Sequence, residues 1–450
     1  MAVSALDSRV FRNLFGTQEV RDIFVDDAYV GFLVEVEAAL ARAEAAVGVI
    51  PTAAGEAITD AFANITLDFE LLARETDIVG YPVLPLVKQL VEGTPGEMAK
   101  YIHWGATTQD IMDDASVLQM KRGLQLVRRE LQTLAEILKG LAEKYRDTPM
   151  AGRTHLQHAL PCTFGYKCAV YLSSILRHQE RLDETERRCL LVQFGGAAGT
   201  LASLQDADTG LRVRAELANQ LDLRDPLITW HVARDTIAEI LNFLALIGGT
   251  LGKIALDLIV MSSNEFDELS EPFVPHRGAS STMPQKRNPI SSEVILAASK
   301  LLRSNASLGL DAMVTDFERA SGPWHLEWVA IPEAFITAVG ALHQTNFALG
   351  GLVVKVDSLS RNLHSSRGLI VGEAVMMGLA PVLGRQKAHD LVYEACKTAI
   401  EENRSLLEVL QEDSDLNRTL PADQLANLCD PLQYLGASQR MVDAVVGALN

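Results

Sequence analysis

Residues 117–145 read VLQMKRGLQLVRRELQTLAEILKGLAEKY, a stretch in which apolar side chains return every three or four positions. This spacing places them on one face of an α-helix, and it continues for about four heptads, far beyond an average helix. A helix of this length needs apolar partners along its whole face, so the stretch predicts a bundle of long helices. The apolar seam consists of Val117, Met120, Leu124, Val127, Leu131, Leu134, Leu138, Leu141 and Tyr145.

The partners of this helix are expected in three further apolar segments, near Tyr166 to Leu182, Ile237 to Met261 and Ile290 to Leu310. Runs that alternate with period two are scarce, so the fold class is predicted to be all-α. The seam is longer than one protomer needs, which indicates oligomerisation through the bundle.

Changes of pattern near residues 104–114 and 354–362 mark the expected domain boundaries. They predict an N-terminal helical domain over residues 1–110, a central long-helix bundle over residues 111–355 and a C-terminal helical domain over residues 356–450.

The charge balance excludes several classes of partner. Among 450 residues, 40 Lys and Arg face 58 Asp and Glu, a formal net charge of −18. Such a chain has no electrostatic footprint for nucleic acid or an anionic membrane, and an anionic substrate must be held by local positive groups. Charged residues Glu239, Lys253 and Asp257 interrupt the most apolar region, so this region is expected to be a buried bundle helix and not a membrane span.

Cysteine usage and the N-terminus indicate a cytoplasmic protein. The five cysteines are odd in number and show no Cys-x-x-Cys spacing, which favours a reducing compartment. The first fifteen residues carry charges and have no signal-peptide core. No His-Glu-x-x-His motif suggests a metal, and Gly248–Lys253 and Gly195–Gly199 lack the context of nucleotide-binding loops, so no metal or cofactor is predicted.

Residues 280–289 read SSTMPQKRNP and have the polar density of a reactive site. Asn288 is a good N-cap and Pro289 suits the first position of the helix that follows. Lys286 and Asn288 would then lie where a helix offers free N–H groups and its positive dipole end, which is a suitable place for a carboxylate. Ser280 and Ser281 are expected on a mobile surface loop that brings a reactive hydroxyl to this anion.

Two other segments are equally polar. His103 to Asp110 reads HWGATTQD and precedes the long helix, where Thr107 or Thr108 can act as a cap. Residues 152–161 read GRTHLQHALP and place two histidines among hydrogen-bonding partners directly after that helix. Taken alone, the first segment is better explained as a capped helix start.

Together the three segments resemble the conserved motifs of the fumarase/aspartase superfamily. Those motifs are Gly-Ser-Ser-x-Met-Pro-x-Lys-x-Asn-Pro, His-x-Gly-x-Thr-Ser/Thr-x-Asp and Gly-x-Thr-His-x-Gln-x-Ala. One departure is visible, because Ala279 stands where the signature has glycine and Gly278 lies one residue earlier. The resemblance implies a three-domain helical fold and a homotetramer in which three subunits supply the three segments to one active site.

The resemblance also implies a mechanism that needs no cofactor. A base removes a proton α to a carboxylate, and the resulting aci-carboxylate dianion expels a group from the neighbouring carbon. By register with the motif, Ser280 is the expected base and Ser281 the second choice, and His155 binds substrate or protonates the leaving group. The expected carboxylate-binding residues are Thr107, Thr108, Lys286 and Asn288, with Gln157, His103 and Arg234 as further substrate-binding candidates. For His103 and Arg234 a structural role is the alternative.

Within the superfamily the chain is most similar to the bacterial 3-carboxy-cis,cis-muconate cycloisomerases, which close a tricarboxylate diene to a lactone in aromatic catabolism. The pattern from Trp324 to Trp328 and the C-terminal residues 430–436 carry this resemblance, and residues 75–79 lack the histidine of adenylosuccinate lyases. Those cycloisomerases have tryptophan where this chain has His155. An alternative is therefore a fumarate-releasing C–N lyase acting on an N-substituted aspartate, and a catalytically silent structural member is a more remote one. Either enzyme would act on a small di- or tricarboxylate.

Overall fold

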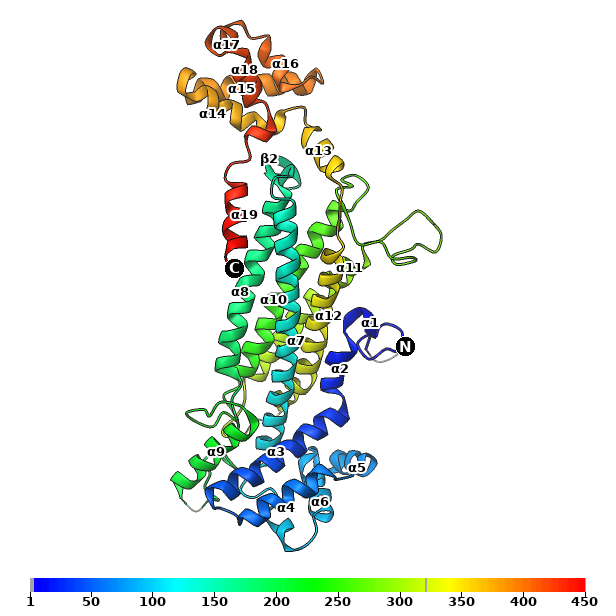
Figure 1. The fold of residues 1–450 in the computed structure, drawn as a ribbon, viewed down its shortest axis with the longest axis vertical. Helices are drawn as coiled ribbons and strands as arrows, with labels where there is room; N and C mark the ends of the chain where they lie inside the picture. The colour runs from blue at the N-terminus through cyan, green and yellow to red at the C-terminus, as the bar shows by residue number, and fades with distance from the viewer. Residues whose placement is uncertain (1–3, 205, 320–321, 450) are drawn as a thin grey trace. The chain divides into compact units, whose positions relative to one another are not determined.

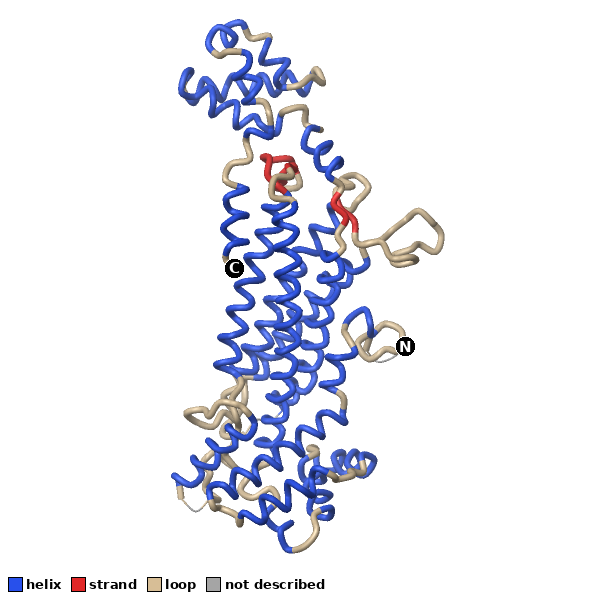
Figure 2. Tube along the Cα trace, in the orientation of Figure 1, coloured by secondary structure: helices blue, strands red, loops and turns tan. Residues whose placement is uncertain are grey.

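A computed structural model describes residues 4–204, 206–319 and 322–449 and is mostly helical (Figures 1 and 2). Its first half comprises α1 (Arg12–Phe15), α2 (Gln18–Phe24), α3 (Asp26–Val47), α4 (Thr52–Ala63), α5 (Phe69–Val79), α6 (Val83–Gly93), the 3₁₀ helix η1 (Glu97–Tyr101), α7 (Thr108–Lys144), β1 (Pro149–Thr154), β2 (Gln157–Thr163), α8 (Phe164–Cys189) and α9 (Ala207–Leu221).

The second half continues with α10 (Asp235–Met261), β3 (Leu269–Ser270), α11 (Ile290–Ala312), η2 (Gly322–Trp324), α12 (His325–Gly350), β4 (Val353–Val354), α13 (Val356–His364), η3 (Leu369–Val371), α14 (Gly372–Leu383), α15 (Arg385–Glu401), α16 (Leu406–Gln411), α17 (Ser414–Thr419), α18 (Ala422–Leu428), η4 (Pro431–Gln433) and α19 (Ser438–Gly447). The predicted all-α class is confirmed.

The chain forms two compact units. Unit 1 consists of Met1–Leu131, His178–Gly252 and Val294–Gln344, and unit 2 of Gln132–Arg177, Lys253–Glu293 and Thr345–Asn450. Each of the five long helices α7, α8, α10, α11 and α12 contributes residues to both units. The three domains expected from the sequence stay a prediction.

The long predicted helix is α7, and its seam forms the expected buried face. All nine seam side chains are buried apart from Leu141, which is partly exposed. The three predicted partner segments are found as α8, α10 and α11. The spacing of the apolar residues was enough to predict this helix and its buried face, because residues three and four apart share one face of a helix.

Within unit 1, α10 packs closely against α11. A Cβ atom added to Gly248 would lie 2.7 Å from Leu302, and one added to Gly309 would lie 2.6 Å from Leu241. By length and composition alone α10 is apolar enough to cross a membrane, and half of its most apolar window is buried inside the protein. The close glycine contacts are those of a bundle helix, which is the role predicted for this segment.

Unit 2 contains a β-hairpin that the sequence did not indicate. β1 and β2 pair antiparallel, with Arg153 opposite His158 and Thr154 opposite Gln157. The turn consists of His155 and Leu156, both with positive φ, 52° and 61°. A two-residue turn of this kind normally carries Asn-Gly or Asp-Gly, so its usual signal is missing here. The hairpin is thus a strand pair that the sequence did not predict, in a fold that is otherwise helical as expected, and it lies directly beside a candidate site residue.

Candidate active-site regions

The segment that gave the strongest motif, residues 271–289, forms a long loop between β3 and α11 (Figure 2). The backbone N–H of Asn288 donates to the carbonyl of Gly278 at 3.0 Å, and Ala279 and Arg287 form an antiparallel bridge. Gly278 has a φ of +69°, and a Cβ atom there would lie 2.4 Å from the Asn288 carbonyl oxygen. The loop therefore requires glycine at position 278, which explains how Ala279 can occupy the usual glycine position of the motif.

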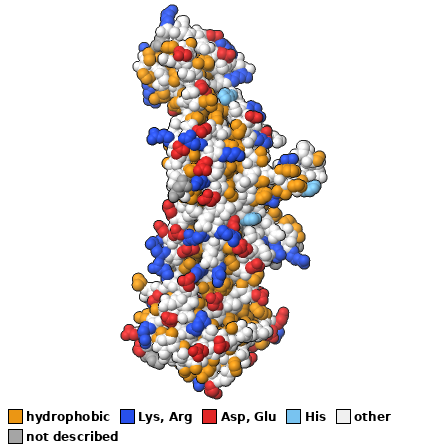
Figure 3. Space-filling view, in the orientation of Figure 1, with side chains coloured by type: hydrophobic (Ala, Val, Ile, Leu, Met, Phe, Trp, Pro, Cys, Tyr) orange, Lys and Arg blue, Asp and Glu red, His pale blue; other side chains and the backbone are white. Residues whose placement is uncertain are grey.

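The outer part of this loop is apolar as well as polar. Phe273 is 64% exposed, and Val274 and Met283 are also exposed. In Figure 3 the protruding loop carries hydrophobic side chains together with Lys or Arg side chains. Exposed apolar side chains in such a group usually mark a contact surface.

Ser280 and Ser281 differ in their surroundings. The Ser280 Oγ accepts hydrogen bonds from the backbone N–H groups of Met283 at 3.1 Å and Thr282 at 3.3 Å, and the Thr282 hydroxyl lies 3.4 Å away. Ser281 is exposed and its hydroxyl makes no hydrogen bond with any described residue. Ser280, unlike Ser281, therefore has two backbone donors on its hydroxyl oxygen, and donors of this kind favour the charged form of an oxygen.

The start of α11 corrects one sequence-based expectation. The helix begins at Ile290, and its free N–H groups are bound by the carboxylate of Glu271 instead of being capped by Asn288. Ser291 donates from its backbone at 3.2 Å, and Ser292 donates from its backbone at 2.8 Å and its hydroxyl at 2.7 Å. A charged acceptor satisfies several donors at once, whereas an amide cap satisfies one. The anion at this helix end is thus the protein's own.

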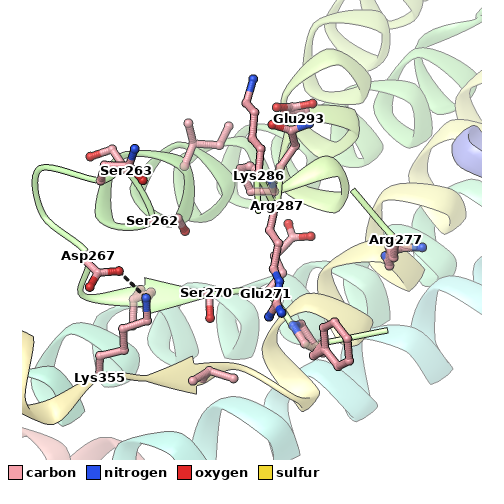
Figure 4. A pocket seen from close by; sticks show the side chains of 18 of the residues that line it. Ser262, Ser263, Asp267, Ser270, Glu271, Arg277, Lys286, Arg287, Glu293 and Lys355 are labelled. Carbon is pink, nitrogen blue, oxygen red and sulfur yellow. Dashed lines mark hydrogen bonds and ion pairs between the residues drawn. The ribbon is translucent and has the colours of Figure 1, made fainter. Parts of the chain in front are cut away.

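A cavity of about 840 Å³ lies beside this loop, and we call it the loop cavity. Four basic side chains line it, namely Arg277, Lys286, Arg287 and Lys355. Figure 4 shows the ion pair between Lys355 and Asp267, with Lys286 extending away from it. Two of the acidic lining groups are already engaged, Asp267 by Lys355 and Glu271 by the helix start. With Asn288 also in its lining, the loop cavity is suited to an anion.

The hairpin places His155 and Gln157 elsewhere in unit 2. Both side chains are exposed, and His155 lines a second cavity, of about 740 Å³, with Lys167, Tyr171 and Asp257. The hairpin is anchored by Arg153, which donates to both oxygens of the buried Glu268 at 3.0 and 2.6 Å. The lining of the loop cavity includes neither His155 nor Gln157, so one chain does not bring these residues into that cavity.

In unit 1 the turn before α7 is held by a buried carboxylate. Asp110 accepts hydrogen bonds from the backbone N–H groups of Thr107 at 3.0 Å, Gly195 at 3.0 Å and Gly196 at 2.9 Å. Its Oδ1 also lies 2.6 Å from the His231 Nε2. Thr107 is thus fixed against the glycine-rich loop, while Thr108 begins α7 with its side chain half-buried.

Arg319 is a residue of this region that the sequence reasoning missed. Its guanidinium donates to the Gln109 Oε1 at 3.1 Å, the Thr107 Oγ1 at 3.3 Å and the carbonyl oxygen of Ala197 at 2.6 Å. The Glu318-Arg319 pair was visible in the sequence, but its partners lie more than a hundred residues away. Arg319 places a positive charge directly at the candidate carboxylate-binding threonine.

Arg234 and His103 occupy structural positions. Arg234 is buried between Asp113, at 2.8 and 2.9 Å, and Glu327, whose Oε1 lies 2.9 Å from the Arg234 Nε. We call these three residues the Arg234 triad. His103 Nδ1 lies 2.6 Å from the buried Glu37; burial lowers the pKa of His103, but the Glu37 carboxylate outweighs it and the pKa is raised. For both residues the structural alternative is the better description of the contacts.

Comparison with known proteins agrees with this architecture. The family model described as lyase matches residues 13–301, and the model described as adenylosuccinate lyase C-terminus matches residues 368–445. Trans-aconitate decarboxylase 1 of Mycosarcoma maydis is 45% identical over 96% of this chain and 88% of its own length. The 3-carboxy-cis,cis-muconate cycloisomerase of Acinetobacter baylyi is 41% identical over 98% of each chain.

A solved structure is similar to this chain over nearly its whole length. The crystal structure of fumarate lyase from Mesorhizobium sp. BNC1 has a TM-score of 0.91 and 50% identity, over 96% of this chain and 98% of that one. Fold and family model together define an enzyme of the lyase type. More closely, the chain belongs to the fumarase/aspartase superfamily, as the three motifs predicted, and it is a lyase or cycloisomerase of that superfamily.

Proposed function

We propose that this enzyme interconverts a small di- or tricarboxylate through an aci-carboxylate intermediate, with Ser280 exchanging the α proton. The observation that carries the proposal is the pair of backbone N–H groups on the Ser280 Oγ, at 3.1 and 3.3 Å. An ordinary serine is far too weak an acid to serve as a base near neutral pH, and these donors favour its ionised form. Ser281 has no comparable support.

The remaining candidate residues fit the charge of such a substrate. Lys286 and Asn288 line the loop cavity, and the substrate carboxylate would be held by these side chains because Glu271 occupies the helix start. Thr107, beside the Arg319 guanidinium, would hold a second carboxylate, with Thr108 next to it. Negative charge that grows on the substrate is thereby met by groups already in place, which is the main source of catalytic power in such reactions.

The first candidate substrate is 3-carboxy-cis,cis-muconate. The 41% identity to the Acinetobacter enzyme and the pattern from Trp324 to Trp328 support this choice. In the addition direction, one carboxylate oxygen of the substrate adds to the conjugated double bond, and the aci-carboxylate then takes a proton on its α carbon from the Ser280 hydroxyl. The Ser280 oxygen regains a proton from water before the next turnover. The reaction is an isomerisation, so no co-reactant is consumed.

The test is a spectrophotometric assay of the purified protein with 3-carboxy-cis,cis-muconate, in which loss of diene absorbance is followed and the product is identified by NMR. Formation of a carboxymuconolactone at enzymatic rates supports the cycloisomerase. An unchanged diene in the presence of a folded protein contradicts it, and substituted aspartates would then be assayed for fumarate release at the absorbance of fumarate.

The alternative is a fumarate-releasing lyase acting on an N-substituted aspartate. It is favoured by His155, which stands exposed at the tip of the hairpin in a left-handed turn conformation, as a proton donor to a leaving group would. The relative from Mesorhizobium is named as a fumarate lyase. His155→Trp discriminates, because a lyase should lose turnover whereas a cycloisomerase should tolerate the change.

We also propose that the enzyme is a homotetramer whose sites are shared between subunits. Within one chain, His155 lines the second cavity, whereas Ser280 belongs to the lining of neither that cavity nor the loop cavity, and the loop exposes Phe273, Val274 and Met283. If sites are shared, mixing Ser280→Ala with His155→Ala subunits should restore part of the activity, since some sites then receive both native residues. The test requires that each variant is inactive by itself. If the mixed and refolded Ser280→Ala and His155→Ala subunits then remain inactive, the sites are not shared. Light scattering gives the subunit number.

A further inference from the structure

A smaller cavity in unit 1 differs in chemistry from the sites above. It has a volume of about 300 Å³, which is enough for a ligand the size of a single substituted ring. Its lining comes mainly from α2, α3, α5, α7, η2 and the first half of α12 and includes Phe24, Tyr29, Trp324 and Trp328. We call it the aromatic cavity.

The aromatic walls are held in place by one another. The Trp324 and Trp328 rings lie 5.2 Å apart, nearly perpendicular, and Tyr81 stacks on Trp324 with centroids 5.8 Å apart. Trp324 is buried, whereas Trp328 is 37% exposed. An aromatic ring that turns its face to a ligand attracts a cation through the negative side of its quadrupole.

The charged groups at this cavity are acidic. Its lining contains Asp26 and Glu327, and no lysine, arginine or histidine stands among the described residues that line it. Glu327 belongs to the Arg234 triad, in which two carboxylates share one guanidinium. Asp26 lies exposed in the first turn of α3 and forms no ion pair with a described residue. Of the two acidic side chains in the lining, Glu327 is paired with Arg234, and Asp26 is the one without an ion pair among the described residues.

Tyr29 adds a polar group. Its hydroxyl makes no hydrogen bond with the described residues, and burial together with the nearby Asp113 raises its pKa, so the phenol stays neutral. A neutral hydroxyl in an apolar wall can accept a hydrogen bond from an N–H group without adding charge.

We propose that the aromatic cavity is a binding site for a small organic cation, a primary ammonium group carried on a ring or a short alkyl chain. The aromatic faces surround the apolar part, Asp26 attracts the ammonium, and the Tyr29 hydroxyl accepts one of its N–H bonds. A carboxylate is disfavoured at the same place, since the lining offers it no cation. The proposed carboxylate chemistry of the loop is independent of this site.

Three probes of one shape test the charge preference: benzylamine, benzyl alcohol and benzoate, each titrated into the intact protein at neutral pH. Binding is followed by calorimetry and by tryptophan fluorescence, since two of the four tryptophans line the cavity. Benzylamine should bind about ten-fold more tightly than benzyl alcohol, and benzoate should be weaker than both. Equal affinities, or preference for benzoate, would overturn the proposal.

Two neighbouring aspartates allow the position of the negative charge to be tested separately from the net charge. Asp26→Asn should weaken benzylamine binding about three- to ten-fold and leave benzyl alcohol unaffected. Asp27→Asn removes the same charge from the same helical turn, but Asp27 does not line the cavity, and it should change little. If the two variants behave alike, the effect belongs to the net charge and not to this site. Because binding is the readout, failure of every carboxylate assay would not affect the outcome.

Discussion

The loop cavity and the aromatic cavity handle charge in opposite ways. In the Arg234 triad beside the aromatic cavity, the side chains of Arg234, Asp113 and Glu327 are only 1 to 3% exposed and bind one another. In the loop cavity, the Lys355 and Asp267 side chains are 36% and 43% exposed. Buried charges without partners are costly, so the charges of the Arg234 triad are committed to folding, whereas the exposed Lys355–Asp267 pair in the loop cavity lies in water and holds the fold less strongly.

The largest effect should follow removal of the Ser280 hydroxyl. Ser280→Ala should lower kcat about 1,000-fold or more, because proton transfer by a positioned group contributes roughly 10² to 10⁴ and the aligned N–H groups would have no oxygen to stabilise. Thermal unfolding should be unchanged, since Ser280 lies on a loop. The measurement is kcat with the substrate identified by the diene or fumarate assay.

Ser281→Ala is the matched control, one residue further along the same loop. Its hydroxyl has no hydrogen bond to the described residues, so kcat should fall much less. If Ser281→Ala shows the larger loss, the base is Ser281, and the hydrogen bonds to Ser280 only shape the loop.

The Arg234 triad should govern stability. Arg234→Met leaves two buried carboxylates without their guanidinium, and the free energy of unfolding should fall by about 3 to 5 kcal/mol. Urea denaturation followed by circular dichroism measures it. Arg303→Met is the control, because Arg303 is exposed on α11 and should cost less than about 0.5 kcal/mol. A loss below about 1 kcal/mol for Arg234→Met would contradict the assignment of this triad to folding.

These contrasts also explain what the sequence could reveal. The helix α7 and its buried seam were predictable because a helical face depends on neighbours three and four residues away. The Glu271 cap of α11 was not, since its carboxylate comes from twenty residues before Ser291. The hairpin around His155 lacks the usual turn residues, and Arg319 meets Thr107 only through the fold. Helices with a regular apolar spacing could therefore be predicted from the sequence, whereas contacts between distant segments could not.

A buried carboxyl on α3, that of Glu44, makes the stability of the protein depend on pH. Glu44 is fully buried, neither of its oxygens has a hydrogen-bond partner among the described residues, and burial, with a contribution from Glu37, raises its pKa to about 9. The folded state therefore holds a proton that the unfolded state releases above its ordinary pKa of 4.5. Stability from this group is greatest below that pH and falls as the pH rises towards about 9.

Glu44→Gln should remove this slope. Between pH 6 and pH 8 the difference in unfolding free energy, variant minus native protein, should increase by about 1 kcal/mol per pH unit. Glu35→Gln, on the exposed side of the same helix, is the control and should leave the slope unchanged. Parallel pH profiles for native protein and Glu44→Gln would show that this carboxyl is not held neutral.

In the loop cavity, Lys286→Ala should weaken binding of the substrate. Hydrogen bonds to charged groups are worth about 1.5 to 3 kcal/mol, so KM should rise roughly ten- to a hundred-fold with kcat changed only a few-fold. Steady-state kinetics separate the two constants. Lys300→Ala removes a charge from the exposed surface of α11 and is the control for net charge. A fall in kcat at unchanged KM would place Lys286 in the chemical step instead.

The smallest effect is expected where an ion pair is most exposed. Lys355→Met removes the partner of Asp267 in the lining of the loop cavity, yet both side chains are more than a third exposed. Water and salt screen such a pair, so the unfolding free energy should change by less than about 1 kcal/mol, and less still at high salt. Urea denaturation at two salt concentrations measures this directly. A loss comparable to that of Arg234→Met would mean that the loop cavity, too, uses its charges to hold the fold, and the contrast between the two cavities would fail.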